Sequence, residues 1–213
     1  MDIAIVLYEG VTALDAVGPY EVLSRLGRDL GFVGHAKGSV RTDSGRLGLS
    51  VHTTFEEVSA PELVVVPGGP GQTAMMGDER LLNWLRHVHG STFWTTSVCT
   101  GALILGAAGL LRGKKATTHW LAMDELHKYG AHATDERVVV DGRIVTAAGV
   151  SSGIDMALRL AALMVGEGGA QAVQLAIEYA PEPPFNAGSP DSAPPRIVAA
   201  LRSRSRFVLE PTD

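Results

Sequence analysis

The fold of this chain is indicated most directly by the stretch Phe93-Trp94-Thr95-Thr96-Ser97-Val98-Cys99-Thr100-Gly101-Ala102-Leu103. Its first half is rich in β-branched and aromatic residues, which favour a strand, and its second half begins a helical pattern. Cys99 therefore lies on a sharp turn from strand to helix. In α/β folds such a turn lifts a nucleophile into a cleft, beside the free amides of the first helical turn.

Cys99 is the only cysteine of the chain, and its position allows two interpretations. Free cysteine is among the most often buried residue types, so Cys99 could be a small apolar filler. The glycine two residues later and the flanking strand and helix favour a reactive thiol, because helix-end amides can hold a thiolate. We expect Cys99 to be the nucleophile of an active site.

The alternation of strand and helix extends along most of the chain. Short β-branched runs lie at Ile3 to Tyr8, Leu63 to Val66, Phe93 to Val98, Arg137 to Val140 and Ile144 to Ala147. Helical patterns lie at Pro19 to Leu26, Arg80 to His89, Thr100 to Leu111, Leu121 to Lys128, Ser152 to Val165 and Ala170 to Glu178. This order predicts an α/β fold with a mostly parallel sheet and helices on both faces.

Other segments follow the alternation less regularly. Phe32 to Ala36 and Leu49 to Thr53 are strand-like, with a polar turn between them. Asp141-Gly142 separates two β runs and predicts a hairpin beside the main sheet. Six prolines in residues 181–195 exclude helix and central strand, so we expect a Pro-rich arm that leads to a short helix near Arg196 to Arg202.

Length and composition are those of one globular unit. A chain of 213 residues can bury a sizeable core, and we predict a single domain over residues 1–213. Hydrophobic residues make up 46% and charged residues 19%, which excludes a largely disordered chain. The net charge of -5 argues against nucleic acid as a partner.

The cellular setting is suggested by the single cysteine and the apolar segments. One cysteine cannot form an internal disulfide or a cysteine-pair metal cluster, so we expect a cytoplasmic protein without a metal. The N-terminus opens on an apolar strand without the pattern of a signal peptide. The apolar segment Ile154 to Val165 carries two charges and is shorter than the roughly 20 residues that cross a bilayer, so we expect no membrane partner.

Residues that follow the strands should meet at one edge of the sheet, where open α/β folds bind ligands. Asp15, in the segment after the first strand, is the acid that we expect to face Cys99 and to exchange a proton with it. Thr12-Ala13-Leu14-Asp15 also has the spacing of a capping box, so Asp15 could simply begin a helix. Pro19 argues against this alternative, because it would then lie inside the helix.

The turn Pro67-Gly68-Gly69 follows another strand and leaves its backbone bare. Its amides could form an oxyanion hole, with the amide of Thr100 as a second donor. The turn could equally be a tight loop without a role in binding. It has neither the Walker lysine nor the dinucleotide glycine pattern, so we expect no phosphate ligand there.

His119, next to Trp120, lies twenty residues after Cys99 and could be its neighbour. A histidine beside a tryptophan is more often a packed, hydrogen-bonded residue than a base, so we favour a pocket wall over proton transfer. The other histidines do not have the spacing of metal ligands.

Four motifs in the same order resemble the DJ-1/PfpI superfamily: Thr-Ala-Leu-Asp15-Ala-Val-Gly-Pro-Tyr-Glu-Val-Leu, Val-Val-Val-Pro-Gly-Gly69, Ser-Val-Cys99-Thr100-Gly-Ala and Ala-Thr-Thr-His119-Trp120. The resemblance extends from about residue 2 to about residue 190. Within the superfamily the chain looks most like the isonitrile hydratase branch, also called cyclohexyl-isocyanide hydratases, whose C-terminal signature is similar to residues 183–190.

The resemblance implies a flavodoxin-like α/β sandwich, usually a homodimer, and hydration of an isonitrile to an N-substituted formamide without a cofactor. It makes Cys99 the nucleophile and Asp15 the acid and base, while Thr100 and Gly69 line the site. We therefore expect the catalytic residues to be Cys99, Asp15 and Thr100, and the substrate-binding residues to be Gly68, Gly69, His119 and Trp120. A thiolate that attacks the isonitrile carbon while Asp15 delivers a proton would give a thioimidate, which water then releases as the formamide.

Two positions separate this chain from sister activities in the superfamily. Thr100 stands where protease-like members have histidine, and Asp15 stands where DJ-1-type members and their glyoxalase relatives have glutamate. Glyoxalase-like chemistry on small aldehydes and a cysteine redox sensor stay open as alternatives. The ligand-sensing half of AraC-type regulators is a third, but only a short tail follows the Pro-rich arm where those proteins have a helix-turn-helix domain.

Overall fold

A seven-stranded sheet forms the centre of the computed structural model, which describes residues 1–207, so the last six residues of the predicted domain lie outside it. The strands follow the order β10-β11-β7-β6-β1-β2-β5 and are parallel except for the β10–β11 pair. Their bounds are β1 (Ile3–Val6), β2 (Leu30–Gly34), β5 (Thr53–Thr54), β6 (Leu63–Val66), β7 (Trp94–Val98), β10 (Val138–Asp141) and β11 (Ile144–Ala147). β1 and β6 are buried along their whole length, as expected of strands covered on both faces.

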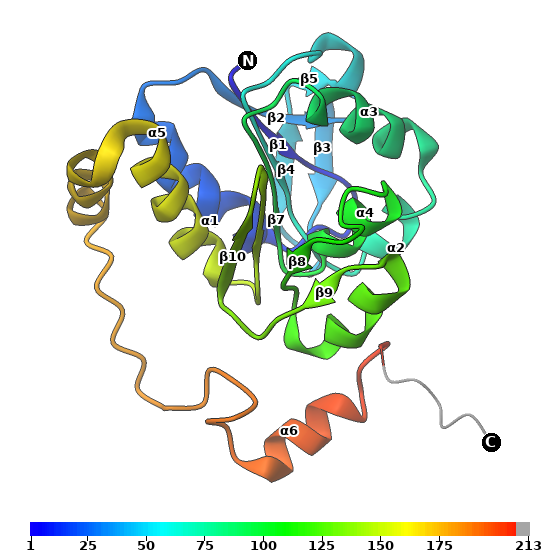
Figure 1. Ribbon diagram of the computed structural model, residues 1–213, viewed down its shortest axis with the longest axis vertical. Helices are drawn as coiled ribbons and strands as arrows, with labels where there is room; N and C mark the ends of the chain where they lie inside the picture. Colours follow the sequence, from blue (N-terminus) through cyan, green and yellow to red (C-terminus); the bar gives the residue numbers. More distant parts are fainter. Residues whose placement is uncertain (208–213) are drawn as a thin grey trace.

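Helices cover both faces of this sheet (Figure 1). α1 (Ala13–Leu23) and α5 (Ser152–Ala176) pack together on one face, while α2 (Gln72–Met75), α3 (Glu79–His89) and α4 (Gly101–Ala107) lie on the other. The short 3₁₀ segments are η1 (Ser24–Leu26), η2 (Phe55–Glu57) and η3 (Trp120–Tyr129). None of the helices within residues 1–207 is both long enough and apolar enough to cross a bilayer.

Two small sheets complete the body, and both differ from the sequence-based expectations. β3 (Gly38–Arg41) and β4 (Gly48–Val51) pair with each other, so the strand expected at Leu49 to Thr53 is divided between β4 and β5. β8 (Lys115–Ala116) pairs with β9 (His132–Ala133). The Asp141-Gly142 hairpin is present, but it is part of the main sheet rather than beside it, because β11 also pairs with β7.

The first helix begins earlier than predicted. α1 starts after Thr12 and contains Pro19, whereas the expectation was a helix that begins at Pro19. Pro19 cannot donate the helical hydrogen bond to the carbonyl of Asp15, yet the helix continues because it packs closely on α5. A Cβ on Gly153 would lie 3.2 Å from the Pro19 ring. Tertiary packing therefore outweighs the local cost of the proline.

Other helix ends also shift. α4 ends at Ala107 rather than Leu111, and the helix expected over Leu121 to Lys128 is the 3₁₀ segment η3. The two helices expected on either side of Gly166 form one continuous run, α5, with a kink at this residue, whose φ is 82°. Glycine adopts a positive φ easily, so the helix is interrupted at Gly166 as predicted, although no loop separates its two parts.

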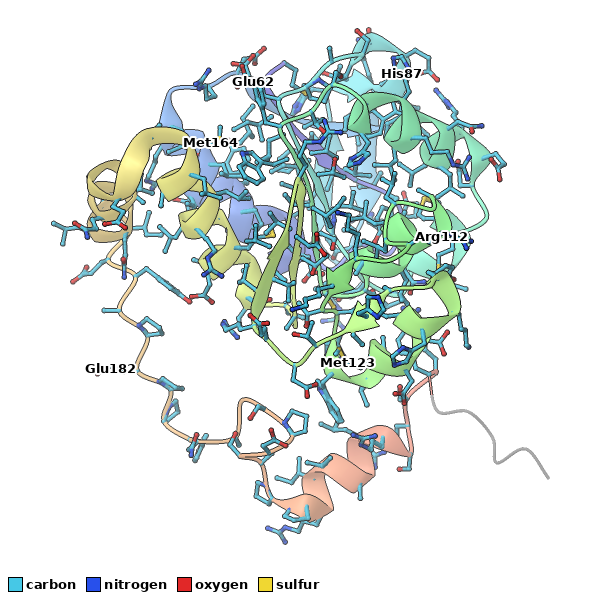
Figure 2. The ribbon with its side chains drawn as sticks, in the orientation of Figure 1. Glu62, His87, Arg112, Met123, Met164 and Glu182 are labelled. Carbon is cyan, nitrogen blue, oxygen red and sulfur yellow. The ribbon has the colours of Figure 1, made fainter. Side chains whose placement is uncertain are left out.

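The C-terminal arm leaves the body after α5. Residues 177–194 form neither helix nor strand and extend past the sheet, and the side chain of Glu182 lies away from the body in Figure 2. The arm leads to α6 (Pro195–Arg202), the short helix expected there, which lies next to η3, the segment that carries Met123.

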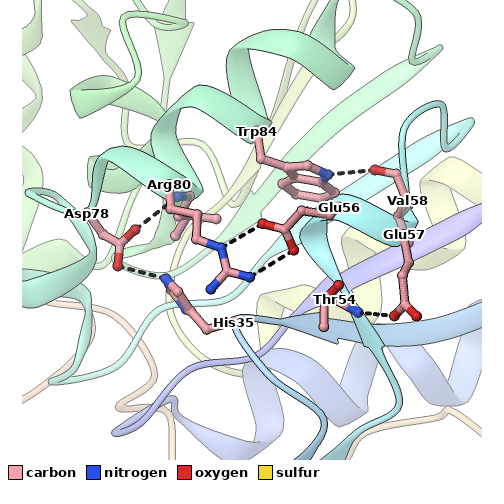
Figure 3. A network of polar contacts seen from close by, with 9 residues as sticks. His35, Thr54, Glu56, Glu57, Val58, Asp78, Arg80 and Trp84 are labelled. Carbon is pink, nitrogen blue, oxygen red and sulfur yellow. Dashed lines mark hydrogen bonds and ion pairs between the residues drawn. The ribbon is translucent and has the colours of Figure 1, made fainter.

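A polar network at the β5 edge joins η2 to α3 (Figure 3). The guanidinium of Arg80 donates to both carboxylate oxygens of Glu56, and His35 pairs with Asp78. The Trp84 indole donates to the carbonyl of Val58 at 2.7 Å. These contacts fix the outer helix on the sheet and take no part in the site described next.

Candidate active site

Cys99 stands on the predicted turn between β7 and α4. Its φ of 56° is in the left-handed region, which only a few non-glycine residues occupy. The strained turn is held on both sides: the Cys99 amide donates to the carbonyl of Ala147 at 3.0 Å, and the Thr118 hydroxyl donates to the carbonyl of Cys99 at 2.8 Å. The side chain is only 5% exposed.

Asp15 lies behind Cys99, at the first turn of α1. It is completely buried, and its Oδ2 accepts a hydrogen bond from the Gly68 amide at 2.9 Å. Its Oδ1 has no hydrogen-bond partner of normal geometry among residues 1–207. The carboxylate therefore does not cap its helix, and the capping-box alternative is wrong: the hydroxyl of Thr12 donates to Asp43 instead.

Burial governs the protonation of Asp15. It raises the pKa of this carboxyl from 3.8 to about 7, against the opposing effect of the hydrogen bond from Gly68 and of the neighbouring Cys99 thiol. Burial also raises the pKa of the Cys99 thiol, and the negative charge of Asp15 adds to this effect. Asp15 and Cys99 are therefore not readily ionised at the same time. At least one of them keeps a proton, which can pass to the other.

Thr100 supports the sulfur atom from the other side. Hydrogen bonds from its backbone amide and its hydroxyl to Cys99 lower the thiol pKa, although burial and Asp15 outweigh them. The Thr100 hydroxyl also accepts from the Gly69 amide at 3.1 Å. Thr100 is therefore the residue whose donors face an anion that forms on Cys99.

The oxyanion hole expected from Gly68 and Gly69 is not available. Both amides already have acceptors, Asp15 for Gly68 and Thr100 for Gly69. The glycines are needed for close approach instead: a Cβ on Gly68 would lie 2.5 Å from the Thr100 nitrogen, and one on Gly69 would lie 2.4 Å from the Thr12 nitrogen. They bring the acid and the threonine to the thiol.

A pocket of about 260 Å³ opens over Cys99. Its walls include Thr100, Gly69 and His119, as expected. Within the part of the chain that the structure describes, Gly68 and Trp120 are not walls of this pocket. Gly68 lies behind it against Asp15, and Trp120 lies beneath the guanidinium of Arg202, 5.4 Å from the ring centre.

His119 has the packed environment that we favoured for it. Its Nδ1 accepts from the Leu121 amide at 3.3 Å, and burial lowers its pKa. Within residues 1–207, no group of three or more histidine, cysteine, aspartate or glutamate side chains is placed to hold a metal ion.

Two neighbours of the site were missed at the sequence level. Tyr8 is buried at the end of β1, donates to the carbonyl of Pro67 at 2.7 Å and interacts with the charges of Asp15 and Cys99. Its place directly after the first strand could have identified it. Arg206, from the C-terminal segment, also lines the pocket, and nothing in the local sequence indicates this return.

Comparisons with known proteins agree with this geometry. Residues 1–163 match the DJ-1/PfpI family. The chain belongs to this family. The isonitrile hydratase of Pseudomonas putida is 45% identical over 213 aligned positions, which cover 96% of this chain and 90% of that protein. The superfamily resemblance stated from the four motifs is confirmed.

Solved structures of DJ-1/PfpI proteins confirm the flavodoxin-like fold. A ThiJ/PfpI family protein from Pseudomonas syringae has a TM-score of 0.92 and 38% identity, covering 94% of this chain and 84% of its own. The DJ-1 protein of Schizosaccharomyces pombe has a TM-score of 0.75 at 16% identity, covering 85% of this chain and 100% of its own, and shows the shared fold alone.

Proposed function

We propose that this protein is a cofactor-independent isonitrile hydratase, a lyase that converts R–N≡C and water to the formamide R–NH–CHO. The observation that carries the proposal is the contact of a completely buried carboxyl, Asp15, with the thiol of Cys99. The 45% identity to the isonitrile hydratase of Pseudomonas putida over nearly the full length of both chains supports the substrate class.

In the first step, the sulfur of Cys99 attacks the terminal carbon of the isonitrile. A carbon–sulfur bond forms, and the thiol proton moves by way of Asp15 to the same carbon, which gives the thioimidate R–N=CH–S–Cys99. The raised pKa values of both groups suit this step, because a proton is present where the carbon must be protonated. The donors of Thr100 stabilise negative charge on the sulfur as the proton leaves.

In the second step, water adds to the thioimidate carbon. Its hydroxyl forms the new carbon–oxygen bond, and its proton ends on nitrogen. The carbon–sulfur bond then breaks, the hydroxyl proton returns to the sulfur through Asp15, and the formamide leaves. Atoms balance without an oxidant or a cofactor, and Cys99 is regenerated as a thiol.

The environment of Cys99 weighs against a redox sensor as the main role. Peroxide reacts with thiolates, and burial raises the pKa of this thiol instead of lowering it. We also infer that the protein is a homodimer, as the family resemblance implies, and that it is located in the cytoplasm, where a single free thiol is best preserved. The dimer is supported by large apolar side chains that lie exposed, Leu175 at 80% and Phe185 at 78%.

The decisive experiment is formamide production from cyclohexyl isocyanide, quantified by chromatography. We expect turnover by the unmodified protein, none by Cys99→Ala, and a loss of at least about 100-fold in Asp15→Asn, whose amide can still accept from Gly68. Asp124→Asn, at an exposed position on η3, is the matched control and should remain fully active. Turnover that persists in Asp15→Asn would overturn the assigned step, and no turnover by the unmodified protein would overturn the substrate class.

A further inference from the structure

The chain returns to its own active site after α6. We call residues 203–207 the tail segment. α6 lies beside η3, where the guanidinium of Arg202 stacks on the ring of Trp120, and the tail segment then turns back toward the body (Figures 1 and 2). Three of its residues, Ser205, Arg206 and Phe207, line the pocket over Cys99.

Arg206 makes three hydrogen bonds, two to the glycine-rich turn and one to the start of α2. Its Nη1 donates to the carbonyl of Pro70 at 2.6 Å, and its Nη2 donates to the carbonyl of Gly69 at 3.1 Å and to Oε1 of Gln72 at 2.9 Å. The acceptors are two backbone oxygens and a neutral amide, so no carboxylate among these partners cancels the guanidinium charge. That charge remains available to the pocket.

Phe207 forms the apolar part of the tail segment. Its ring lies under the Arg206 guanidinium, 4.7 Å from the ring centre, and packs against the hydrophobic core. The hydroxyl of Ser205 accepts from the Phe207 amide at 3.1 Å and fixes the local turn. The segment thus presents one cation and one aromatic ring at the same wall of the pocket.

We propose that the tail segment is a functional wall of the active site, in which Arg206 stabilises negative charge on Cys99 and Phe207 limits the size of the substrate's substituent. The identity of the substrate in this proposal rests on the proposed function, the hydration of isonitriles. Arg206 is a positioning residue in this scheme, because it acts through the sulfur and the turn rather than on the reacting carbon.

The charges around the sulfur explain why a cation is useful there. Asp15 from α1 and Tyr8, which follows β1, face Cys99 with groups that are neutral or negative, and burial lowers the pKa of His119, which favours its neutral form. Arg206 and Cys99 line the same pocket, and the positive charge of Arg206 lies close enough to interact with Cys99 and with Tyr8. Arg206 is thus the positive group in this set, and it opposes the repulsion between Asp15 and a thiolate.

The charge role is tested without turnover, by the rate at which iodoacetamide alkylates Cys99 across a pH series. At about pH 8 we expect Arg206→Met to react roughly tenfold more slowly, because the alkylation rate follows the thiolate fraction. Arg206→Lys, which keeps the charge, should recover most of the rate. Arg204→Met is the matched control on the same segment. Within residues 1–207 the Arg204 side chain makes no hydrogen bond or ion pair, so this variant should react at the rate of the unmodified protein.

Two results would overturn the charge role. One is an alkylation profile of Arg206→Met that coincides with that of the unmodified protein. The other is an alkylation rate that is higher in Arg206→Met than in the unmodified protein by the same factor at every pH. Such a result would mean that the segment only blocks access of the reagent to the thiol. A shift of the profile to higher pH, rescued by lysine, is the result expected from the proposal.

The size role is tested by alkylation with N-ethylmaleimide and the bulkier N-cyclohexylmaleimide. In Phe207→Ala we expect the ratio of the bulky to the small rate to rise about fivefold or more, because the pocket gains the volume of the ring. An unchanged ratio would overturn this role. Both tests read the thiol directly, so they remain decisive even if no isonitrile is hydrated, and failure of the proposed function is then seen separately.

Discussion

Asp15 shows how complete burial changes the chemistry of one residue. In water its carboxyl would be ionised at neutral pH, but here desolvation raises the pKa from 3.8 to about 7. A single amide, that of Gly68, solvates the carboxylate on one side. The residue is therefore ready to give and take a proton near neutral pH, which suits an acid that must also act as a base.

The same burial makes Asp15 a source of pH-dependent instability. Because the folded pKa is raised, the folded state binds more protons than the unfolded state between about pH 4 and pH 7, and stability falls as the pH rises through this range. We expect Asp15→Asn to exceed the unmodified protein by about 2–4 kcal/mol in free energy of unfolding above about pH 7, since the asparagine has no charge to bury. The difference should shrink toward pH 4.

Urea unfolding at a series of pH values measures this difference. Asp124→Asn, exposed on η3, is the control and should leave the pH dependence of unfolding unchanged. A constant difference between Asp15→Asn and the unmodified protein at every pH would contradict the raised pKa of the carboxyl in the folded state.

At the scale of elements, the site depends on how closely the start of α4 approaches the end of β6. A Cβ on Gly101 would lie 2.0 Å from the carbonyl oxygen of Val66, which backbone atoms cannot tolerate. The strained turn at Cys99, which hydrogen bonds to Ala147 and Thr118 hold, lies two residues before this close contact. The glycine after the cysteine is therefore required by packing as well as by the turn.

Gly101→Ala should destabilise the protein by about 3 kcal/mol or more, because the backbone of β6 or α4 must move. Gly168→Ala is the contrasting variant: this glycine lies in α5 with open space around it, and the change should stabilise by about 0.5–1 kcal/mol. Thermal unfolding of both variants checks the pair. A Gly101→Ala protein as stable as the unmodified one would show that the junction is not tightly packed.

At the scale of the whole molecule, the C-terminal arm separates from the body and leaves apolar side chains uncovered. Phe185 on the arm and Leu163 on α5 are both largely exposed. An extended arm of this kind is suited to pack on a second copy of the chain, which would cover apolar surface that a monomer leaves in water.

Sedimentation equilibrium should therefore give a mass near twice the 22.4 kDa of the chain. Phe185→Ser should weaken the association, because it removes an exposed ring from the arm, whereas Arg204→Met should not. A mass of one chain at all concentrations would contradict the homodimer.

The strands and the turn at Cys99 were predictable from the sequence because their signals are local. β6, β7 and β11 match the expected runs closely, since β-branched residues in short apolar stretches favour buried parallel strands. The meeting of Asp15, Gly69 and Cys99 at one edge was predictable as well, because the carboxyl ends of parallel strands share that edge. These elements follow from patterns a few residues long.

The remaining features were decided by the tertiary structure alone, because they depend on contacts between segments far apart in the chain. The start of α1 depends on its packing against α5, and the amides of Gly68 and Gly69 have acceptors that come from α1 and from the turn after β7. The sequence identified Cys99, Asp15, Thr100, Gly69 and His119 as members of the site, but not Tyr8 or Arg206. Their protonation, pairing and enclosure by Arg206 were decided by burial and Coulomb interactions, which depend on distance in space and not on spacing along the chain.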